Sequence, residues 1–186
     1  MSDQRGEVLL PIARAAISNA LKVSCGADES APWLVEHGAC FVTLTQSGEL
    51  RGCIGSLQAH RPLLADVKGN AVSAALRDPR FPPLNMDELD ITEIEISLLS
   101  TAQDMIVQNE ADALAQLRPH VDGIVFEYGP YRSTFLPQVW ESLSQPRDFL
   151  AMLRRKAGLP GDFWAEDVKL SRYSVTKWRE KDYVNS

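Results

Sequence analysis

The sequence lacks the features of a protein that is stabilised by disulfides or by a bound metal ion. Its three cysteines, Cys25, Cys40 and Cys53, form no Cys-x-x-Cys pair and cannot all pair with one another, which argues against a disulfide framework and a zinc site. The three histidines are too far apart in the chain for metal-ligand spacing. The sequence therefore predicts no metal site, which leaves open a site that only the fold would assemble, and no residue pattern indicates a cofactor.

Long apolar runs and an excess of positive charge are absent as well. No stretch approaches the roughly 20 apolar residues that cross a bilayer, and the first residues have neither the basic segment nor the apolar core of a signal peptide. We therefore expect a cytoplasmic protein without a membrane partner. With 19 basic and 25 acidic residues, the net charge of −6 attracts no nucleic acid. Basic residues are dense only at residues 154–156, which we expect to form a solvated helix face.

What remains is the composition of an ordinary globular domain. The chain has 186 residues, of which 45% are hydrophobic and 24% charged, so it can bury a large core without covalent staples. Because residues 1–186 contain no repeats or low-complexity tracts, we predict a single domain. The proline cluster at residues 79–83 is the candidate boundary between two lobes, although it is too short for a flexible linker.

Periodicity predicts helices that alternate with short strands. Helical spacing of apolar residues is found over residues 4–23, 62–76, 110–117, 137–143 and 147–157. Strand-like patterns are found over residues 39–45, 50–57, 91–99, 123–128, 131–136 and 168–178. The turns at residues 46–49 and 129–130 join neighbouring strands as hairpins. Antiparallel hairpins with helices packed on the sheet predict an α+β fold.

The segment Leu50-Arg51-Gly52-Cys53-Ile54-Gly55 combines residue types that can do chemistry. In a regular strand Arg51, Cys53 and Gly55 share one face, and the other three residues share the opposite face. A glycine such as Gly52 inside a strand marks a bulge or a close approach by another backbone or a ligand. A nearby guanidinium favours the thiolate, which makes Cys53 a candidate nucleophile. The alternative is that Cys53 is a small buried apolar residue and Arg51 pairs with a strand carboxylate.

Glu93 and Glu95 form the second candidate group. Their spacing puts both carboxylates on one side of the predicted strand, where they could act as general acid and base or bind a cation. The alternative is the ordinary polar face of a half-exposed strand. If the two strands are neighbours, Arg51 would pair with one of these carboxylates.

Three further residues lie close to these groups in the sequence. Asp78 and Arg80 either form a local turn bridge or line a pocket. His60 follows Cys53 and is the nearest candidate base for a Cys–His arrangement; the alternative is an unpaired surface histidine.

At residues 50–55 the chain resembles the AMMECR domain family, whose signature is similar to this hexapeptide. The resemblance continues, in the family's order, through Arg61-Pro62-Leu63, Asp78-Pro79-Arg80-Phe81-Pro82-Pro83-Leu84, Glu93-Ile94-Glu95-Ile96-Ser97, Leu136-Pro137-Gln138-Val139 and Lys156-Ala157-Gly158-Leu159-Pro160. It implies a mixed α+β fold with a larger and a smaller lobe and a cleft near residues 51–55. The chain departs from the family at Met152 and Leu153, where relatives often carry a cysteine, and residues 173–180 are unusually basic. The missing cysteine argues against a two-cysteine site.

The resemblance also implies partners. Similar proteins are encoded beside, or fused to, a Memo-like protein that resembles extradiol ring-cleaving dioxygenases, and a radical SAM protein often accompanies them. The chain looks like protein A of this AmmeMemoRadiSam set. These are associations of genes rather than mechanisms.

Two hypotheses about function follow. In the first, the chain is a ligand-handling or catalytic subunit whose site surrounds residues 51–55. The candidate catalytic residues are Cys53, Arg51, Glu93 and Glu95, and the candidate ligand-binding residues are Gly52, Gly55, Asp78 and Arg80. Arg51 would hold an anionic group, Cys53 would act as nucleophile or redox thiol, and a carboxylate would move protons. In the second, the chain is a non-catalytic adaptor that docks the Memo-like and radical SAM partners.

Overall fold

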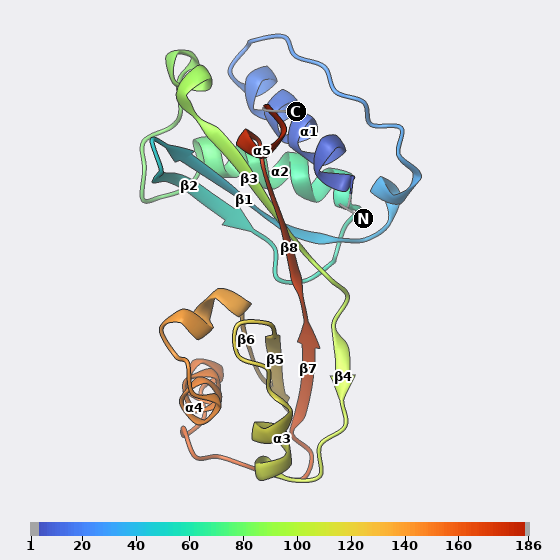
Figure 1. Ribbon diagram of the computed structural model, residues 1–186, viewed down its shortest axis with the longest axis vertical. Helices are drawn as coiled ribbons and strands as arrows, with labels where there is room; N and C mark the ends of the chain where they lie inside the picture. Colours follow the sequence, from blue (N-terminus) through green and yellow to red (C-terminus); the bar gives the residue numbers. More distant parts are fainter. Residues whose placement is uncertain (1–3, 185–186) are drawn as a thin grey trace. The chain divides into compact units, whose positions relative to one another are not determined.

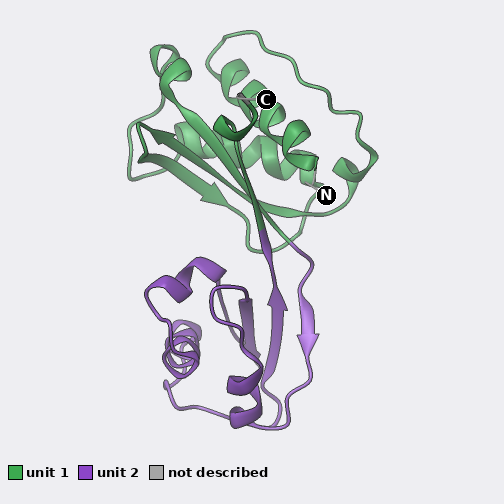
Figure 2. Ribbon diagram, in the orientation of Figure 1, with its two compact units in different colours: residues 1–99, 176–186 green, residues 100–175 purple. Residues whose placement is uncertain are grey.

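The computed structural model describes residues 4–184 as two compact units (Figures 1 and 2). Of the described residues, unit 1 comprises 4–99 and 176–184, and unit 2 comprises 100–175. The proline cluster at residues 79–83 lies inside unit 1, so our expectation that it separates two lobes is wrong. No helix in the described part of the chain is long and apolar enough to cross a membrane.

Unit 1 is a four-stranded sheet with two long helices on one face (Figure 1). The strand order is β2-β1-β3-β8, and the strands are β1 (Ala39–Gln46), β2 (Glu49–Gly55), β3 (Glu93–Leu99) and β8 (Val175–Arg179). The helices are α1 (Arg5–Ala20), α2 (Leu63–Leu76) and the short α5 (Lys181–Val184), with 3₁₀ turns η1 (Pro32–Val35) and η2 (Met86–Ile91). Pro11 lies within α1 without ending it.

Side-chain alternation fixes which face of this sheet meets the helices. On β3, Ile94 and Ile96 are fully buried, whereas Glu93 and Glu95 are partly exposed, which confirms the predicted alternation. The buried side chains form one core with apolar residues of α1 and α2. The opposite face of the sheet carries the polar residues.

Unit 2 is a second antiparallel sheet with its own core. Its strand order is β4-β7-β5-β6, and the strands are β4 (Gln103–Met105), β5 (Gly123–Tyr128), β6 (Tyr131–Phe135) and β7 (Lys169–Tyr173). Its helices are α3 (Glu110–Gln116) and α4 (Pro146–Ala157), with the 3₁₀ turn η3 (Pro137–Glu141). Trp140 stacks on Phe149 with ring centroids 3.8 Å apart, and its indole N–H donates to the Asp122 carbonyl at 2.8 Å. The predicted α+β class is confirmed.

Some predicted elements need correction. The expected strand over residues 168–178 is two strands, β7 and β8, which belong to different sheets and are interrupted at Ser174. Alternation continues through that residue, so periodicity alone could not detect the break. The short β4 was missed, and residues 137–141 form a 3₁₀ turn rather than an α-helix. Within residues 154–156, Arg154 is only 2% exposed, so the expected solvated face is wrong for that residue.

Candidate functional site

A β-bulge interrupts the pairing of β1 and β2. Before the irregularity Thr45 lies opposite Leu50, and after it Leu44 lies opposite Gly52. Arg51 is therefore the extra residue on β2. Bulges of this kind re-aim the side chain of the extra residue and displace the register of every residue beyond it.

The bulge puts Cys53 on the polar face of the sheet. With regular hairpin pairing Cys53 would lie opposite the buried Val42, but the added residue places it opposite Thr43 instead. Leu50 precedes the bulge and is exposed, so our prediction that it shares a face with Gly52 is wrong. Regular alternation failed here because it assumes an uninterrupted strand.

Three residues from two segments, β1 and the loop after α2, contact Cys53. Thr43 Oγ1 lies 3.3 Å from Cys53 Sγ. The Cys53 backbone N–H donates to Asp78 Oδ2 at 3.0 Å, and the Cys53 carbonyl accepts from Arg80 Nη2 at 3.4 Å. The Cys53 side chain is partly exposed. The structure thus brings Cys53, Asp78 and Arg80 together, and we call these residues with Thr43 the Cys53 cluster.

Asp78 and Arg80 form the local bridge that was one of the two alternatives for them. Arg80 Nε donates to Asp78 Oδ1 at 3.0 Å and Nη2 to Oδ2 at 2.8 Å, a bidentate geometry. These hydrogen bonds, with those from the backbone N–H groups of Cys53 and Arg80, hold the pKa of Asp78 well below its ordinary value. The same contact raises the pKa of Arg80. Asp78 is buried, whereas the Arg80 side chain is 55% exposed and can meet a ligand.

Arg51 pairs with a carboxylate of η2 rather than with the thiol. Its Nε and Nη2 donate to Glu88 Oε1 at 3.0 Å and Oε2 at 3.2 Å. This pairing is the main cause that lowers the pKa of Glu88. Arg51 is only 9% exposed, and its Nη1 is buried without a hydrogen bond among the described residues. The guanidinium that can assist Cys53 is therefore that of Arg80.

Protein packing accounts for both glycines of the segment. A Cβ atom on Gly52 would collide with the Ala74 carbonyl oxygen of α2, and one on Gly55 would collide with the Phe41 ring. The close approach that Gly52 predicts is thus an approach by another backbone. These glycines shape the strand that carries Cys53.

Glu95 lies in the same cross-strand row as the thiol. Thr43 is opposite Cys53 on one side and opposite Glu95 on the other, so about 10 Å separate Cys53 from Glu95. The Glu95 carboxylate accepts a hydrogen bond from Arg179 Nε at 2.6 Å. It is therefore on the correct face but outside hydrogen-bonding distance of the thiol.

Glu93 and His60 do not join the Cys53 cluster. Lys181 Nζ lies 4.0 Å from Glu93 Oε1, and neither strand carboxylate pairs with Arg51, whose ligand is Glu88. His60 is exposed, and its Nδ1 lies 3.0 Å from the Gln58 carbonyl oxygen. In the described part of the chain, no group of three or more His, Cys, Asp or Glu side chains is placed to hold a metal ion.

Comparisons with known proteins extend over nearly the whole chain. The AMMECR1 family model matches residues 10–178. The chain belongs to the AMMECR1 family. The MJ0810 protein of Methanocaldococcus jannaschii is 37% identical, covering 95% of this chain and 90% of its own. The uncharacterized protein PH0010 of Pyrococcus horikoshii is 32% identical, and its crystal structure matches with a TM-score of 0.77 over 97% of this chain and 94% of that chain.

Two residues of this AMMECR1-family site were missed from the sequence. Thr43 has no distinguishing local pattern, since it is one of several β-branched residues in β1, and its place beside Cys53 depends on the bulge. Glu88 lies in a 3₁₀ turn that periodicity does not detect. The one available signal was the sequence Asn85-x-x-Glu88, because Asn85 and Glu88 form a capping box at the start of η2.

Proposed function

We propose that this AMMECR1-family chain is a ligand-handling subunit whose site is the Cys53 cluster. The observation that carries the proposal is a partly exposed cysteine whose backbone carbonyl accepts a hydrogen bond from the guanidinium of Arg80, a side chain that is itself more than half exposed. Arg80 would bind an anionic group of the ligand, and the Cys53 thiolate would add to an electrophilic carbon. Asp78 would be a positioning residue, because it fixes both Arg80 and the Cys53 backbone.

Arg51 and Glu95 take different parts in this proposal. Arg51 would position η2 against β2, since its hydrogen bonds are directed at Glu88. Glu95 would meet the end of a ligand that extends along the cross-strand row, about 10 Å from the thiol. Glu93 would contribute negative charge at the margin of the same face.

The experiment is alkylation of the full chain with iodoacetate and iodoacetamide, read at each cysteine by peptide mass spectrometry. In both reactions the thiolate sulfur forms a bond to carbon, iodide leaves with the electron pair, and the thiol proton passes to water. We expect the iodoacetate-to-iodoacetamide rate ratio at Cys53 to exceed that at Cys25 by about threefold, because Arg80 attracts the anionic reagent. Cys25 is the matched control, since the one hydrogen bond of its sulfur among the described residues is with the Gly26 carbonyl, and the buried Cys40 should stay unreacted.

Two variants separate charge from structure. Arg80→Gln should reduce the Cys53 ratio to that of Cys25, and Arg80→Lys should retain most of it. Added salt should reduce the wild-type preference, since exposed charges are screened. Equal ratios at Cys53 and Cys25 in the wild type, or a Cys53 that reacts only in denaturant, would show that the thiol is structural.

A second candidate function is an adaptor for the Memo-like and radical SAM proteins that the family resemblance implies. The supporting observation is that Met86 and Ile91, at the two ends of η2, are exposed large apolar side chains; such residues are enriched where proteins bind each other. Replacing both with serine should abolish co-purification with either partner and leave Cys53 alkylation unchanged. Unchanged co-purification would rule out η2 as the docking element.

A further inference from the structure

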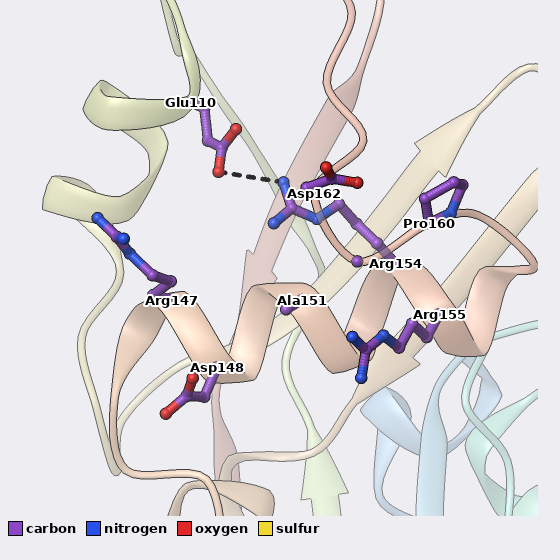
Figure 3. Close-up of a pocket in the computed structure, with 9 residues that line it drawn as sticks. Glu110, Arg147, Asp148, Ala151, Arg154, Arg155, Pro160 and Asp162 are labelled. Carbon is purple, nitrogen blue, oxygen red and sulfur yellow. Dashed lines mark ion pairs between the residues drawn. The ribbon is translucent and has the colours of Figure 1, made fainter.

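Unit 2 contains a charged pocket that is independent of the Cys53 cluster (Figure 3). It has a volume of about 840 Å³ and is formed by one face of α4, the loop that follows α4, and the first residue of α3. This volume lies within the roughly 300–1,000 Å³ of small-molecule sites. The pocket differs from most such sites because six of its nine lining residues are charged.

Arg154 is the buried arginine of this pocket. It is 2% exposed, and its Nη1 donates to the Phe163 carbonyl at 2.9 Å and lies 3.3 Å from Glu110 Oε1 (Figure 3). Its Nε is buried and has no hydrogen-bond partner among the described residues. A buried N–H without a partner costs about 1–3 kcal/mol. The edge of the guanidinium formed by Nε and Nη2 is the one that carboxylates and phosphates bind bidentately.

Arg147 and Arg155 flank this buried guanidinium on α4. The Arg147 side chain makes no ion pair with any residue that the structure describes. Arg155 has a contact from Nη1 to Met152 Sδ at 3.6 Å, and a Cβ atom on Gly161 would lie 2.8 Å from its Nε. The loop therefore lies against the Arg155 guanidinium at Gly161.

Three carboxylates, those of Glu110, Asp148 and Asp162, also line the pocket. Glu110 is the ion-pair partner of Arg154, which leaves two arginines and two aspartates without an ion pair among residues 4–184. Such a pocket is suited to a solute that carries an anionic group together with hydrogen-bond donors such as hydroxyl or amino groups.

We propose that this pocket binds the oxyanion of a small polar solute, a phosphate or a carboxylate. Arg154 receives the oxyanion, the two flanking arginines attract it into the pocket, and Asp148 and Asp162 accept hydrogen bonds from the remainder of the solute. Arg154 thereby gains the partner that the described chain does not supply. This proposal goes beyond the function of the Cys53 cluster and uses none of its residues.

The test is a titration of the isotopically labelled full chain with inorganic phosphate, and separately with acetate, at constant ionic strength by NMR. We expect saturable shifts of the Ala151, Arg155 and Gly161 amide signals. Arg147→Gln should weaken binding at least fivefold. Lys169→Gln is the matched control, because it removes one positive charge from an exposed site of the same unit outside the pocket, and it should weaken binding less than twofold.

Each outcome decides the proposal. Tighter binding of phosphate than of acetate identifies a phosphorylated solute, and the reverse order identifies a carboxylated one. Arg154→Lys keeps the charge but loses the bidentate edge, so it should weaken binding about tenfold. Shifts that do not saturate, or that decrease equally in Arg147→Gln and Lys169→Gln, would overturn the proposal. Neither result would affect the alkylation of Cys53.

Discussion

Both units bury an arginine, but they use its hydrogen-bonding groups differently. In unit 1, Arg51 directs Nε and Nη2 at both oxygens of Glu88, so its bidentate edge is occupied. In unit 2, Arg154 uses only Nη1, and its bidentate edge makes no hydrogen bond in the described chain. The first arrangement links β2 to η2, and the second leaves a buried Nε without a hydrogen-bond partner among the described residues.

This difference shows why a signature residue is not automatically a ligand-binding residue. Arg51 belongs to the segment that resembles the family signature, yet its charge is matched within the protein. Arg154 belongs to a basic run that sequence reasoning assigned to solvent, yet it is among the most buried large side chains. Both arginines are buried, and what distinguishes them is whether Nε has a carboxylate partner, which residue type alone does not reveal.

The largest effect on stability should come from a substitution in β2 beside Arg51. A Cβ atom on Gly52 would meet the backbone of α2 at Ala74, which cannot turn aside as a side chain could. We expect Gly52→Ala to lower the free energy of unfolding of unit 1 by about 3 kcal/mol. Urea denaturation with peptide-level hydrogen exchange would measure the loss for each unit.

Gly26→Ala is the matched control for that substitution. A Cβ atom at Gly26 would have no neighbour within 4 Å, so the change should stay within about 0.5 kcal/mol. A Gly52→Ala chain as stable as the wild type would show that β2 and α2 separate easily, and the bulge would then not fix the direction of Arg51.

Removing each buried arginine should give unequal losses. Arg51→Met should cost about 2 kcal/mol, less than for a fully buried pair because the Glu88 side chain is 21% exposed. Arg154→Met should cost about 1 kcal/mol, because Glu110 is 35% exposed and lies near only one nitrogen of Arg154. Each of the two substitutions also removes one unpaired N–H. Urea denaturation measures both. Equal losses of stability would show that Arg154, like Arg51, mainly links two elements of the fold.

Local sequence patterns predicted the parts of the fold that depend on local physics. The hairpin of β1 and β2 has alternating apolar residues and a Ser-Gly turn, and α2 begins after Pro62 and has its apolar stripe at helical spacing. The family resemblance is confirmed by the family match. The break between β7 and β8 was not predictable from local pattern, because it depends on tertiary pairing: one extended segment contributes a strand to each of the two sheets.

The site was predictable only in composition. Cys53, Asp78 and Arg80 were all candidates, and their mutual contacts came from the fold. The pairing of Arg51 with Glu93 or Glu95 depended on β2 and β3 being neighbours, and it did not form because β1 lies between these strands and Arg51 pairs with Glu88 instead. A single inserted residue changes every partner beyond it, and no periodicity reports such an insertion in advance.

The smallest predicted effect is the pH dependence of the stabilisation that the Arg51–Glu88 pair contributes. Because Arg51 lowers the folded-state pKa of Glu88, the stabilisation is fully present above the ordinary glutamate value of about 4.3 and is lost as pH falls through the lower folded value. The stability difference between wild type and Arg51→Met should therefore shrink as the pH falls below about 4.3. Urea denaturation of both chains at a series of pH values measures it.

The control for this dependence is Glu88→Gln. In that background Arg51 has no carboxylate beside it to ionise, so the stability change caused by Arg51→Met should be independent of pH over the same range. Asp78 also has a lowered pKa, but it is present in all four chains and cancels in each difference. The stability difference between wild type and Arg51→Met could instead stay constant down to the pH at which the protein unfolds. The Arg51–Glu88 contact would then contribute as a neutral hydrogen bond, and the contrast between the two buried arginines would not be electrostatic.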